Sequence, residues 1–444
     1  MSSTELRWVA APPLVARDAD VLADGSGIVL LAMSEPEAAS SLVRAFETGI
    51  TEEQGEDWFV SGGPVSVAAW FHLFEVLSEA GRLAPVVIGP DGVVELRLLR
   101  SLDDTTAYTG RPDPADAELV LAPEAMMFRR IDRWRIECPT AWAVADLTSE
   151  VMTAILSPAG DWTRHDVARA LLREAGILVP DTTARTDMWE PHDRYFHWRS
   201  RRGGHPYVVG ATYPLREKRE ALPVTEVPSH VDDFDLAAHA SDASSALAMP
   251  IGEAFARRRS DRQTPTPLSL RALADFCLAH RALSIVHACE DVEYSQSRRL
   301  YPGGGATYEL DLYLTTRGVE LLPAGVWWFD AEHPRLCRVS AEDSHVEAII
   351  ADAMISTGGV GEIEVLVTYG LRMGRNSWKY EGMAYRLALL DAGVLYGHAY
   401  LLGAALGIGV CGLGNGDSRV LADVLGGDPW QVVSLAEVLL SGAR

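Results

Sequence analysis

Arg257-Arg258-Arg259-Ser260-Asp261-Arg262 is a basic run that directly follows a short helical pattern beginning at Ile251. It concentrates four guanidinium groups and one hydroxyl. Guanidinium groups match phosphate oxygens in a bidentate geometry, so the run is a candidate phosphate site. A solvated basic patch with salt bridges to neighbouring acids is the alternative, because charge runs usually face water. The run alone does not decide between the two.

The charge of the whole chain limits what the protein can bind. Asp and Glu number 62 against 39 Lys and Arg, which gives a net charge of -23 over 444 residues. Such a chain repels nucleic-acid phosphates and anionic lipid surfaces, so we expect no nucleic acid and no membrane as partners. An anionic cofactor would need a local cluster of cations or backbone amides.

The cysteines and the apolar stretches indicate the compartment. No CxxC pair occurs, so we expect no metal site and no disulfide framework from Cys138, Cys277, Cys289, Cys337 and Cys411. No basic segment followed by an apolar run stands at the N-terminus, and the longest apolar stretch, Ala399–Val410, is too short to span a bilayer. We therefore expect a cytoplasmic protein.

The length predicts two or three domains. Residues 1–115 combine a strand, helical patterns and a final hairpin, an order typical of a winged-helix unit; the segments are 27–32, 36–48, 64–80, and 85–88 with 93–98. Residues 116–187 follow a similar pattern, with a segment at 118–122, a strand at 129–137 and helices at 143–156 and 163–175. Thr163 is a candidate cap of the last helix, and Gly176 ends it.

The remaining sequence divides into an arm and a dense C-terminal domain. Residues 188–250 show little periodicity and read as a connecting arm. Residues 251–444 follow the order helix, strand, strand, helix, helix, and the last two helices are expected at 385–406 and 418–425. The chain is therefore expected to be an α+β protein.

Two glycine-rich turns follow the basic run. Pro302-Gly303-Gly304-Gly305 leads into a strand at 310–315, and its bare backbone would allow a flat ligand to approach closely. The turn Gly412-Leu413-Gly414 follows a long apolar helix, and its amides could donate to a ring nitrogen or a phosphate. A plain flexible loop for the first turn and a helix cap for the second are the alternatives.

In their order and spacing these motifs resemble the SagB-type branch of the nitroreductase family. Arg258-Arg259-Ser260-Asp261-Arg262 is similar to its Arg-Arg-Ser-x-Arg flavin-phosphate motif, and Pro302-Gly303-Gly304-Gly305 to its Pro-Ser-Gly-Gly turn. Further matches in series are Lys379-Tyr380, Tyr385-Arg386, 389–393 and 412–416, and the arm resembles the branch at 189–201. The resemblance covers roughly Gly252 to the C-terminus.

The resemblance implies a nitroreductase-like FMN domain, preceded by one or two winged-helix-like modules similar to RiPP recognition elements. It implies an FMN-dependent azoline dehydrogenase that oxidises thiazoline or oxazoline rings of a ribosomally made precursor peptide. The implied partners are that peptide, a possible cyclodehydratase and a second copy in a homodimer. The implied flavin-binding residues are Arg258, Arg259, Ser260, Arg262, Pro302, Gly303, Gly304, Gly412, Leu413 and Gly414.

Lys379 and Tyr380 match the pair that the branch ties to catalysis. Ring oxidation removes a proton from one carbon and a hydride from its neighbour, so a base near the flavin is needed. A lysine serves as a base only when burial or nearby cations lower its pKa. An exposed lysine beside a packed tyrosine is the alternative.

The sequence departs from the branch at several positions. Glu381 replaces the usual glycine after the Lys-Tyr pair, Met383 replaces an arginine, and Gly303 replaces the serine of the turn. His398 stands where the branch often has an asparagine, and a packed histidine is the expected role. These changes affect substrate geometry more than flavin binding.

Two other functions remain open. An FMN oxidoreductase of small molecules would not need residues 1–180. A flavin-less scaffold that only binds peptide would keep the fold without catalysis. Neither the ring type nor the peptide is encoded in these motifs.

Overall fold

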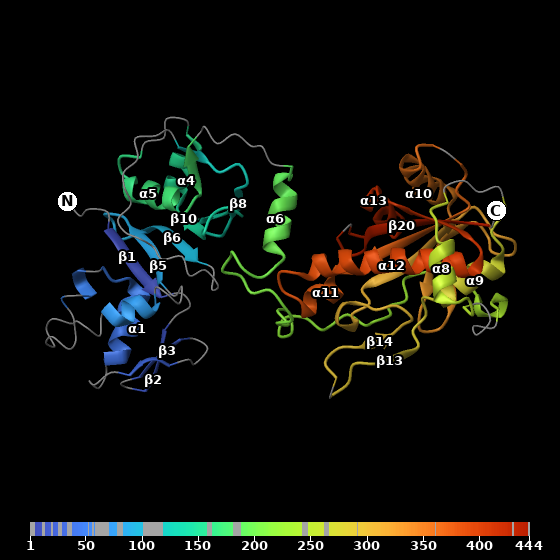
Figure 1. Cartoon of the computed structure of the whole chain (residues 1–444), viewed down its shortest axis with the longest axis horizontal. Coiled ribbons are helices and arrows are strands. Elements are labelled where there is room, and N and C mark those ends of the chain that lie inside the picture. Colours follow the sequence, from blue (N-terminus) through green and yellow to red (C-terminus); the bar gives the residue numbers. More distant parts are fainter. Residues whose placement is uncertain are drawn as a thin grey trace. The chain divides into compact units, whose positions relative to one another are not determined.

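The computed structural model divides the chain into two units, Met1–Val209 and Gly210–Arg444, each described here by itself (Figure 1). It describes residues 5–10, 14–18, 21–24, 29–32, 38–51, 53–55, 57, 71–77, 83–100, 119–157, 162–180, 188–241, 247–261, 266–290, 292–359, 361–428 and 430–442. The finer division at 115, 187 and 250, and the winged-helix assignment of the first two segments, stay predictions.

The first unit is built on an antiparallel sheet in the order β1-β5-β6-β10-β9-β8. Its strands are β1 (Glu5–Ala10), β5 (Leu83–Ile88), β6 (Val94–Arg100), β8 (Met126–Arg129), β9 (Trp134–Glu137) and β10 (Ala143–Leu147). The predicted hairpin is confirmed, because β5 and β6 pair across a turn closed by the Gly89 amide and the Val93 carbonyl. Of the predicted helix 64–80, residues 71–77 are helical and the rest lie outside the described residues.

Smaller elements complete this unit. A three-stranded sheet is formed by β2 (Leu14–Asp18), β3 (Val21–Asp24) and β4 (Val29–Ala32), and a two-stranded sheet by β7 (Leu119–Leu121) and β11 (Leu178–Pro180). Besides the helical residues 71–77, the described part of this unit contains the helices α1 (Ala38–Thr48), α4 (Ser149–Leu156), α5 (Asp166–Glu174) and α6 (Pro191–Arg199).

Three sequence predictions in this unit are wrong in detail. The helix predicted from Ala143 begins only at Ser149, because residues 143–147 form β10 between two partner strands and Thr148 caps the helix. The strand predicted at 129–137 is a hairpin of β8 and β9. Helix α5 begins at Asp166 with His165, not Thr163, at its N-cap.

The first half of the predicted arm is helical and packs on the first unit. Tyr195 on α6 and Tyr207 both donate hydrogen bonds to the Glu137 carboxylate, at 3.0 and 2.5 Å. The guanidinium of Arg199 lies 3.8 Å from the centre of the Tyr207 ring. Hydrophobic periodicity does not predict α6, because its aromatic and basic residues form no apolar stripe along the helix.

The second unit is built on a seven-stranded antiparallel sheet in the order β12-β17-β16-β15-β18-β20-β19. The strands are β12 (Asp232–Phe234), β15 (Leu310–Thr316), β16 (Gly325–Asp330), β17 (Arg335–Ser340), β18 (Val365–Leu371), β19 (Gly409–Leu413) and β20 (Val433–Ser441). Every residue of β15 and β18 is buried, since both faces of the sheet are covered. The predicted strand at 310–315 is confirmed, whereas β20 had not been predicted.

Helices cover both faces of this sheet (Figure 1). On one face lie α9 (Leu270–Leu278) and the long α12 (Ala384–Leu406), with α8 (Ile251–Arg257) against α12. On the other lie α10 (Asp343–Ser356) and α13 (Ser418–Val424). The unit also contains α11 (Met373–Lys379), the 3₁₀ turns η1 (Ala237–His239) and η2 (Gly304–Ala306), and the pair β13 (Ser284–Val286) and β14 (Gln296–Arg298). The two helices predicted at 385–406 and 418–425 are confirmed.

Within the described residues, α12 alone is long and apolar enough to span a bilayer. Its Ala388, Leu395 and Ala399 are buried against the sheet, so these positions belong to the core of the unit. Such packing is typical of a core helix.

The stability of the second unit is expected to depend on its central strand. Leu314 on β15 is fully buried, so Leu314→Ala should lower the free energy of unfolding by about 2–5 kcal/mol through lost burial and a cavity. The control Leu321→Ala removes a leucine that is 70 % exposed and should change it by less than about 0.5 kcal/mol. Urea unfolding followed by the fluorescence of the buried Trp327 and Trp328 measures both; equal effects would contradict this account of the core.

Candidate active site

The basic run lies at the rim of a cavity of about 510 Å³ between the end of α8 and α12. Arg258, Arg259 and Ser260 are exposed there, while the backbone amide of Asp261 bonds to the Val410 carbonyl on β19 at 2.9 Å. Arg262 lies outside the described residues. The structure thus fixes the run against the sheet, with Arg258 and Arg259 lining the cavity and Ser260 exposed between Arg259 and Asp261.

Tyr400 on α12 joins the basic run to the second glycine turn. Its hydroxyl lies 3.1 Å from the Ser260 hydroxyl and accepts a hydrogen bond from the Gly412 amide at 2.9 Å. The Arg258 guanidinium lies 5.6 Å from the centre of its ring. These contacts bring Arg258, Ser260 and Gly412 together; we call them the phosphate-end group.

No role for Tyr400 was predicted from the sequence, although the sequence contains a pattern that indicates one. Tyr396 and Tyr400 are four residues apart on an apolar helix, so both point to one side. Tyr396 donates to the Leu413 carbonyl at 2.6 Å. A side-chain carbon added to Gly412 would lie 3.1 Å from the Tyr396 ring, whereas Gly414 is exposed with open space around it.

The first glycine turn lies against the Lys379-Tyr380 pair. We call the turn and this pair together the lysine group. The Lys379 ammonium donates to the Gly305 carbonyl at 3.1 Å and to the Tyr294 hydroxyl at 2.5 Å. Gly305 has a φ of +59°, and a side-chain carbon there would lie 1.9 Å from the Tyr380 hydroxyl. Only glycine fits this position, because any larger residue would displace Tyr380.

Backbone strain marks the same turn. Ala306 and Tyr308 have φ values of +58° and +45°, a region that residues with a side chain rarely adopt. At Gly303 a serine side chain would begin 3.1 Å from the Tyr308 ring, which is closer than ordinary contact. This crowding is a physical reason for the glycine that replaces serine here. Pro302 at the start of the turn is exposed.

The second part of the arm holds the segment around Lys379, at the end of α11, in place. Gly210 and Glu381 exchange backbone hydrogen bonds, and the Tyr213 amide donates to the Lys379 carbonyl at 3.1 Å. The Glu381 carboxylate also accepts a hydrogen bond from Thr212 at 2.7 Å. Glu381, which departs from the branch pattern, therefore tethers the arm.

The surroundings of Lys379 favour its cationic form. Burial lowers its pKa, but the hydrogen bond to Tyr294 and the nearby phenols outweigh burial, so the pKa is raised overall. Burial raises the pKa of Tyr380. The lowered lysine pKa that a base requires is therefore not present before a ligand binds. Tyr294 was missed because it is distant from Lys379 in sequence.

A buried carboxylate pair stands behind the glycine turn. Asp391 on α12 accepts a hydrogen bond from the Gly304 amide at 2.8 Å. Glu309 is fully buried and accepts hydrogen bonds from Thr307 and Asn376. Burial, and then the charge of Asp391, raises the pKa of Glu309 to about 7. Burial also raises the pKa of Asp391, so the protonated form is favoured at both carboxyl groups beside the turn.

The two groups lie on opposite sides of α12. Asp391 and Tyr400 are nine residues apart on this helix, which is about 14 Å along its axis and about 180° around it. His398 belongs to neither group: it packs against His280 and Tyr301 and lies 3.2 Å from the Ala279 carbonyl, and burial lowers its pKa. The expected role of a packed histidine agrees with these contacts.

Glu309→Gln should flatten the dependence of stability on pH. The folded-state pKa of Glu309 lies above its ordinary 4.5, so the folded protein binds the extra proton and loses stability as pH rises from about 4.5 through about 7. The part that the variant removes is on the order of 2–3 kcal/mol. Urea unfolding at pH 5 and pH 8 measures it, with Glu217→Gln, an exposed glutamate, as control; an unchanged difference between the two pH values would contradict the assignment.

Comparison with known proteins identifies the family of this region. Residues 256–438 match the model of the nitroreductase family. A Methanocaldococcus jannaschii protein named as a nitroreductase is 24 % identical over 170 residues, which are 38 % of this chain and 80 % of that protein.

Two solved structures are also similar. A nitroreductase structure from Ralstonia eutropha JMP134 has 18 % identity and a TM-score of 0.38, over 51 % of this chain and 96 % of that one. A chain of the E. coli microcin synthetase McbBCD complex with truncated pro-MccB17 bound has 18 % identity and a TM-score of 0.36, over 52 % and 82 %. It is the match of residues 256–438 to the family model that identifies a nitroreductase-family domain, of mixed α and β structure, in the C-terminal unit.

Proposed function

We propose that this chain is an FMN-dependent dehydrogenase that oxidises thiazoline or oxazoline rings of a ribosomally made peptide to thiazole or oxazole. The observation that carries the proposal is the lysine group. Lys379, from the pair tied to catalysis in SagB-type enzymes, contacts the glycine turn through the Gly305 carbonyl. The family match of residues 256–438 supports flavin chemistry in the same domain.

The phosphate-end group fits the cofactor chemically. Arg258 and Arg259 offer two guanidinium groups and Ser260 a hydroxyl beside a cavity, in a chain whose net charge is -23. These residues would hold the phosphate, with Arg262 as a further proposed contact, while the turns at 302–304 and 412–414 would flank the ring system. Bound FMN supplies an acceptor for two electrons.

Lys379 is the proposed proton acceptor. Only two of the 39 basic side chains are lysines, Lys218 and Lys379, and a lysine can lose its proton at a pH where an arginine cannot. A ring bound over Lys379 would exclude water, which favours the neutral amine. The amine could then take the proton from the ring carbon, and the Tyr294 hydroxyl at 2.5 Å could pass it on.

A homodimer is part of the proposal. The phosphate-end group and the lysine group lie on opposite sides of α12, so one flavin would more easily contact both when two copies meet. Leu389 and Leu390 on α12 are 40 % and 54 % exposed and offer an apolar surface for such contact.

The first unit is proposed to bind the leader segment of the peptide. Strand β8 ends the described order of its sheet, and Met127 and Phe128 on it are 42 % and 39 % exposed. An extended peptide can add to such an edge. A cyclodehydratase that forms the rings is the proposed partner, in the cytoplasm.

Replacing both arginines should weaken FMN binding. Each charge-assisted contact contributes about 1.5–3 kcal/mol, so Arg258→Ala with Arg259→Ala should raise the FMN Kd by about a hundredfold or more. Arg202→Ala removes an exposed arginine of the first unit and is the control. Flavin fluorescence titration gives the Kd, and a double variant that binds like the control would exclude this phosphate site.

Lys379→Ala should leave FMN bound but slow ring oxidation by about two orders of magnitude or more, the scale of a lost general base. Turnover is measured as loss of two hydrogens from an azoline peptide by mass spectrometry. Because the Lys379 pKa is raised, the wild-type rate should increase with pH as the amine becomes neutral. Lys379→Arg keeps the charge and should be as slow as the alanine variant, whereas Lys218→Ala should be unaffected.

The proposed function is wrong if purified protein with bound FMN leaves azoline peptides unchanged in the presence of the cyclodehydratase partner. Full turnover by a chain lacking residues 1–180 would favour a small-molecule oxidoreductase. A protein that cannot take up FMN would favour a scaffold role.

A further inference from the structure

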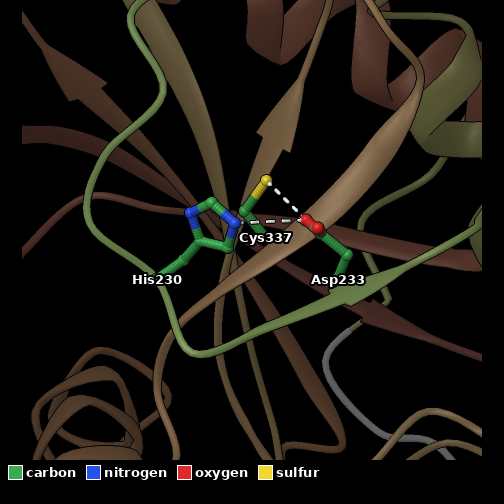
Figure 2. Close-up of side chains that lie close together, drawn as sticks. All are labelled: His230, Asp233 and Cys337. Carbon is green, nitrogen blue, oxygen red and sulfur yellow. Dashed lines mark hydrogen bonds and ion pairs between the residues drawn. The ribbon is translucent and has the colours of Figure 1, made fainter.

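A second cluster of chemically active side chains lies at one end of the seven-stranded sheet. His230, Asp233 and Cys337 meet where β12 pairs with β17 (Figure 2). Strand β12 is at one end of the seven-stranded order and β19, which carries Gly412, is at the other. The cluster therefore lies at the opposite end of the sheet from Gly412 and shares no residue with the proposed flavin site.

Strand pairing builds this cluster. Asp233 and Cys337 are direct partners in the register of β12 and β17, and the Val231 amide donates to the Arg338 carbonyl just beside them. His230 stands one residue before Val231 and turns its ring to the same side (Figure 2). The three ligand atoms lie within 4.8 Å of one another.

The hydrogen bond of His230 orients its free nitrogen into the cluster. Nδ1 lies 2.9 Å from the Pro228 carbonyl, which can only accept, so Nδ1 carries a hydrogen. In the neutral ring Nε2 then has a lone pair, and it faces Asp233 Oδ1 at 3.4 Å. This lone pair and the Asp233 oxygen, which also accepts a hydrogen bond from the Cys337 thiol, can both serve as ligands to one metal ion. Metal-binding histidines typically make this kind of bond to a carbonyl with the other nitrogen.

Two of the three separations between the ligand atoms are close to those of a tetrahedral metal site, and all three atoms lie within 4.8 Å of one another. With metal bonds of about 2.0–2.1 Å to nitrogen and oxygen and about 2.3 Å to sulfur, tetrahedral angles give separations of about 3.3 Å for N to O and about 3.5 Å for S to O. The structure has 3.4 Å from His230 Nε2 to Asp233 Oδ1 and 3.3 Å from Cys337 Sγ to the same oxygen.

The surroundings leave one side of the cluster open. Cys337 is fully buried, whereas the His230 and Asp233 side chains are 26 % and 48 % exposed, so an ion can enter from solvent. Arg335 binds the other oxygen, Asp233 Oδ2, at 3.1 Å and also contacts Asp330. Its guanidinium thereby orients the carboxylate with Oδ1 toward the cluster and balances part of the negative charge.

We propose that His230, Asp233 and Cys337 bind one zinc ion, with water in the fourth position. A thiolate, an imidazole and a carboxylate form a ligand set that zinc prefers over magnesium or calcium. On binding, the Cys337 thiol releases its proton to solvent and a zinc–sulfur bond forms. The ion would tie the short edge strand β12 to β17 and would keep one coordination position open to water.

Sequence motifs for metal ligands do not detect this site, because Asp233 and Cys337 are 104 residues apart. The sequence prediction of no metal relied on the missing CxxC pair, which detects only ligands that are close in the chain. Here the sheet register brings the ligands together.

Zinc content of the full-length protein tests the proposal. After exposure to zinc and dialysis, the wild type should retain about one equivalent by elemental analysis, and Co²⁺ as a probe should give a sulfur-to-cobalt charge-transfer band. Cys337→Ser and His230→Ala should each lose most of the zinc and the band. Cys289→Ser removes the exposed thiol outside the cluster and is the matched control.

If the Cys337→Ser variant fails to fold, the His230→Ala variant still tests the proposal. His230 is exposed, so its replacement should leave the fold intact. A wild type that retains no zinc, or a His230→Ala variant that retains as much as Cys289→Ser, would overturn the proposal. The cluster would then be a set of hydrogen bonds in which the Cys337 thiol donates to Asp233. None of these outcomes depends on catalytic activity or on bound flavin.

Discussion

The antiparallel pairing of β15 with β18 is the constraint on which the lysine group depends. Leu310, the first residue of β15, pairs with Leu371, the last residue of β18, and the Arg372 amide extends the ladder to the Glu309 carbonyl. The turn before β15 and the helix after β18 therefore lie at the same edge of the sheet. Residues about 75 positions apart, Gly305 and Lys379, meet there through a hydrogen bond. Both strands are fully buried, so the register is strongly fixed.

Helix α12 positions the remaining parts of the candidate site. Asp391 fixes the first glycine turn and Tyr400 fixes the second turn together with the basic run, from opposite sides of one helix. Each contact uses a single side chain to hold a backbone amide, so the turns have defined positions despite their glycines. Under the proposed function, this arrangement would separate phosphate binding from proton transfer, with one core helix fixing the distance between the two sites.

Local charge has different effects in the phosphate-end group and in the lysine group. At the basic run, exposed arginines work against a chain of net charge -23, which suits an anionic ligand. At Lys379, phenols and a carbonyl stabilise the ammonium and raise its pKa. Proton transfer at this site would therefore depend on water exclusion by the ligand rather than on neighbouring cations.

Local sequence by itself determined the long helix α12, strand β15, the β5–β6 hairpin and the motifs at 258–260, 302–305 and 379–380, because periodicity, turn residues and short spacings are properties of adjacent residues. It misassigned residues 143–147, where two partner strands outweighed a helical pattern. Only the tertiary structure decided which motifs meet, that Tyr294 and Tyr400 join them, and that Asp233 lies beside Cys337. The physical reason is that these contacts arise from sheet register and helix packing between distant segments, which no local pattern encodes.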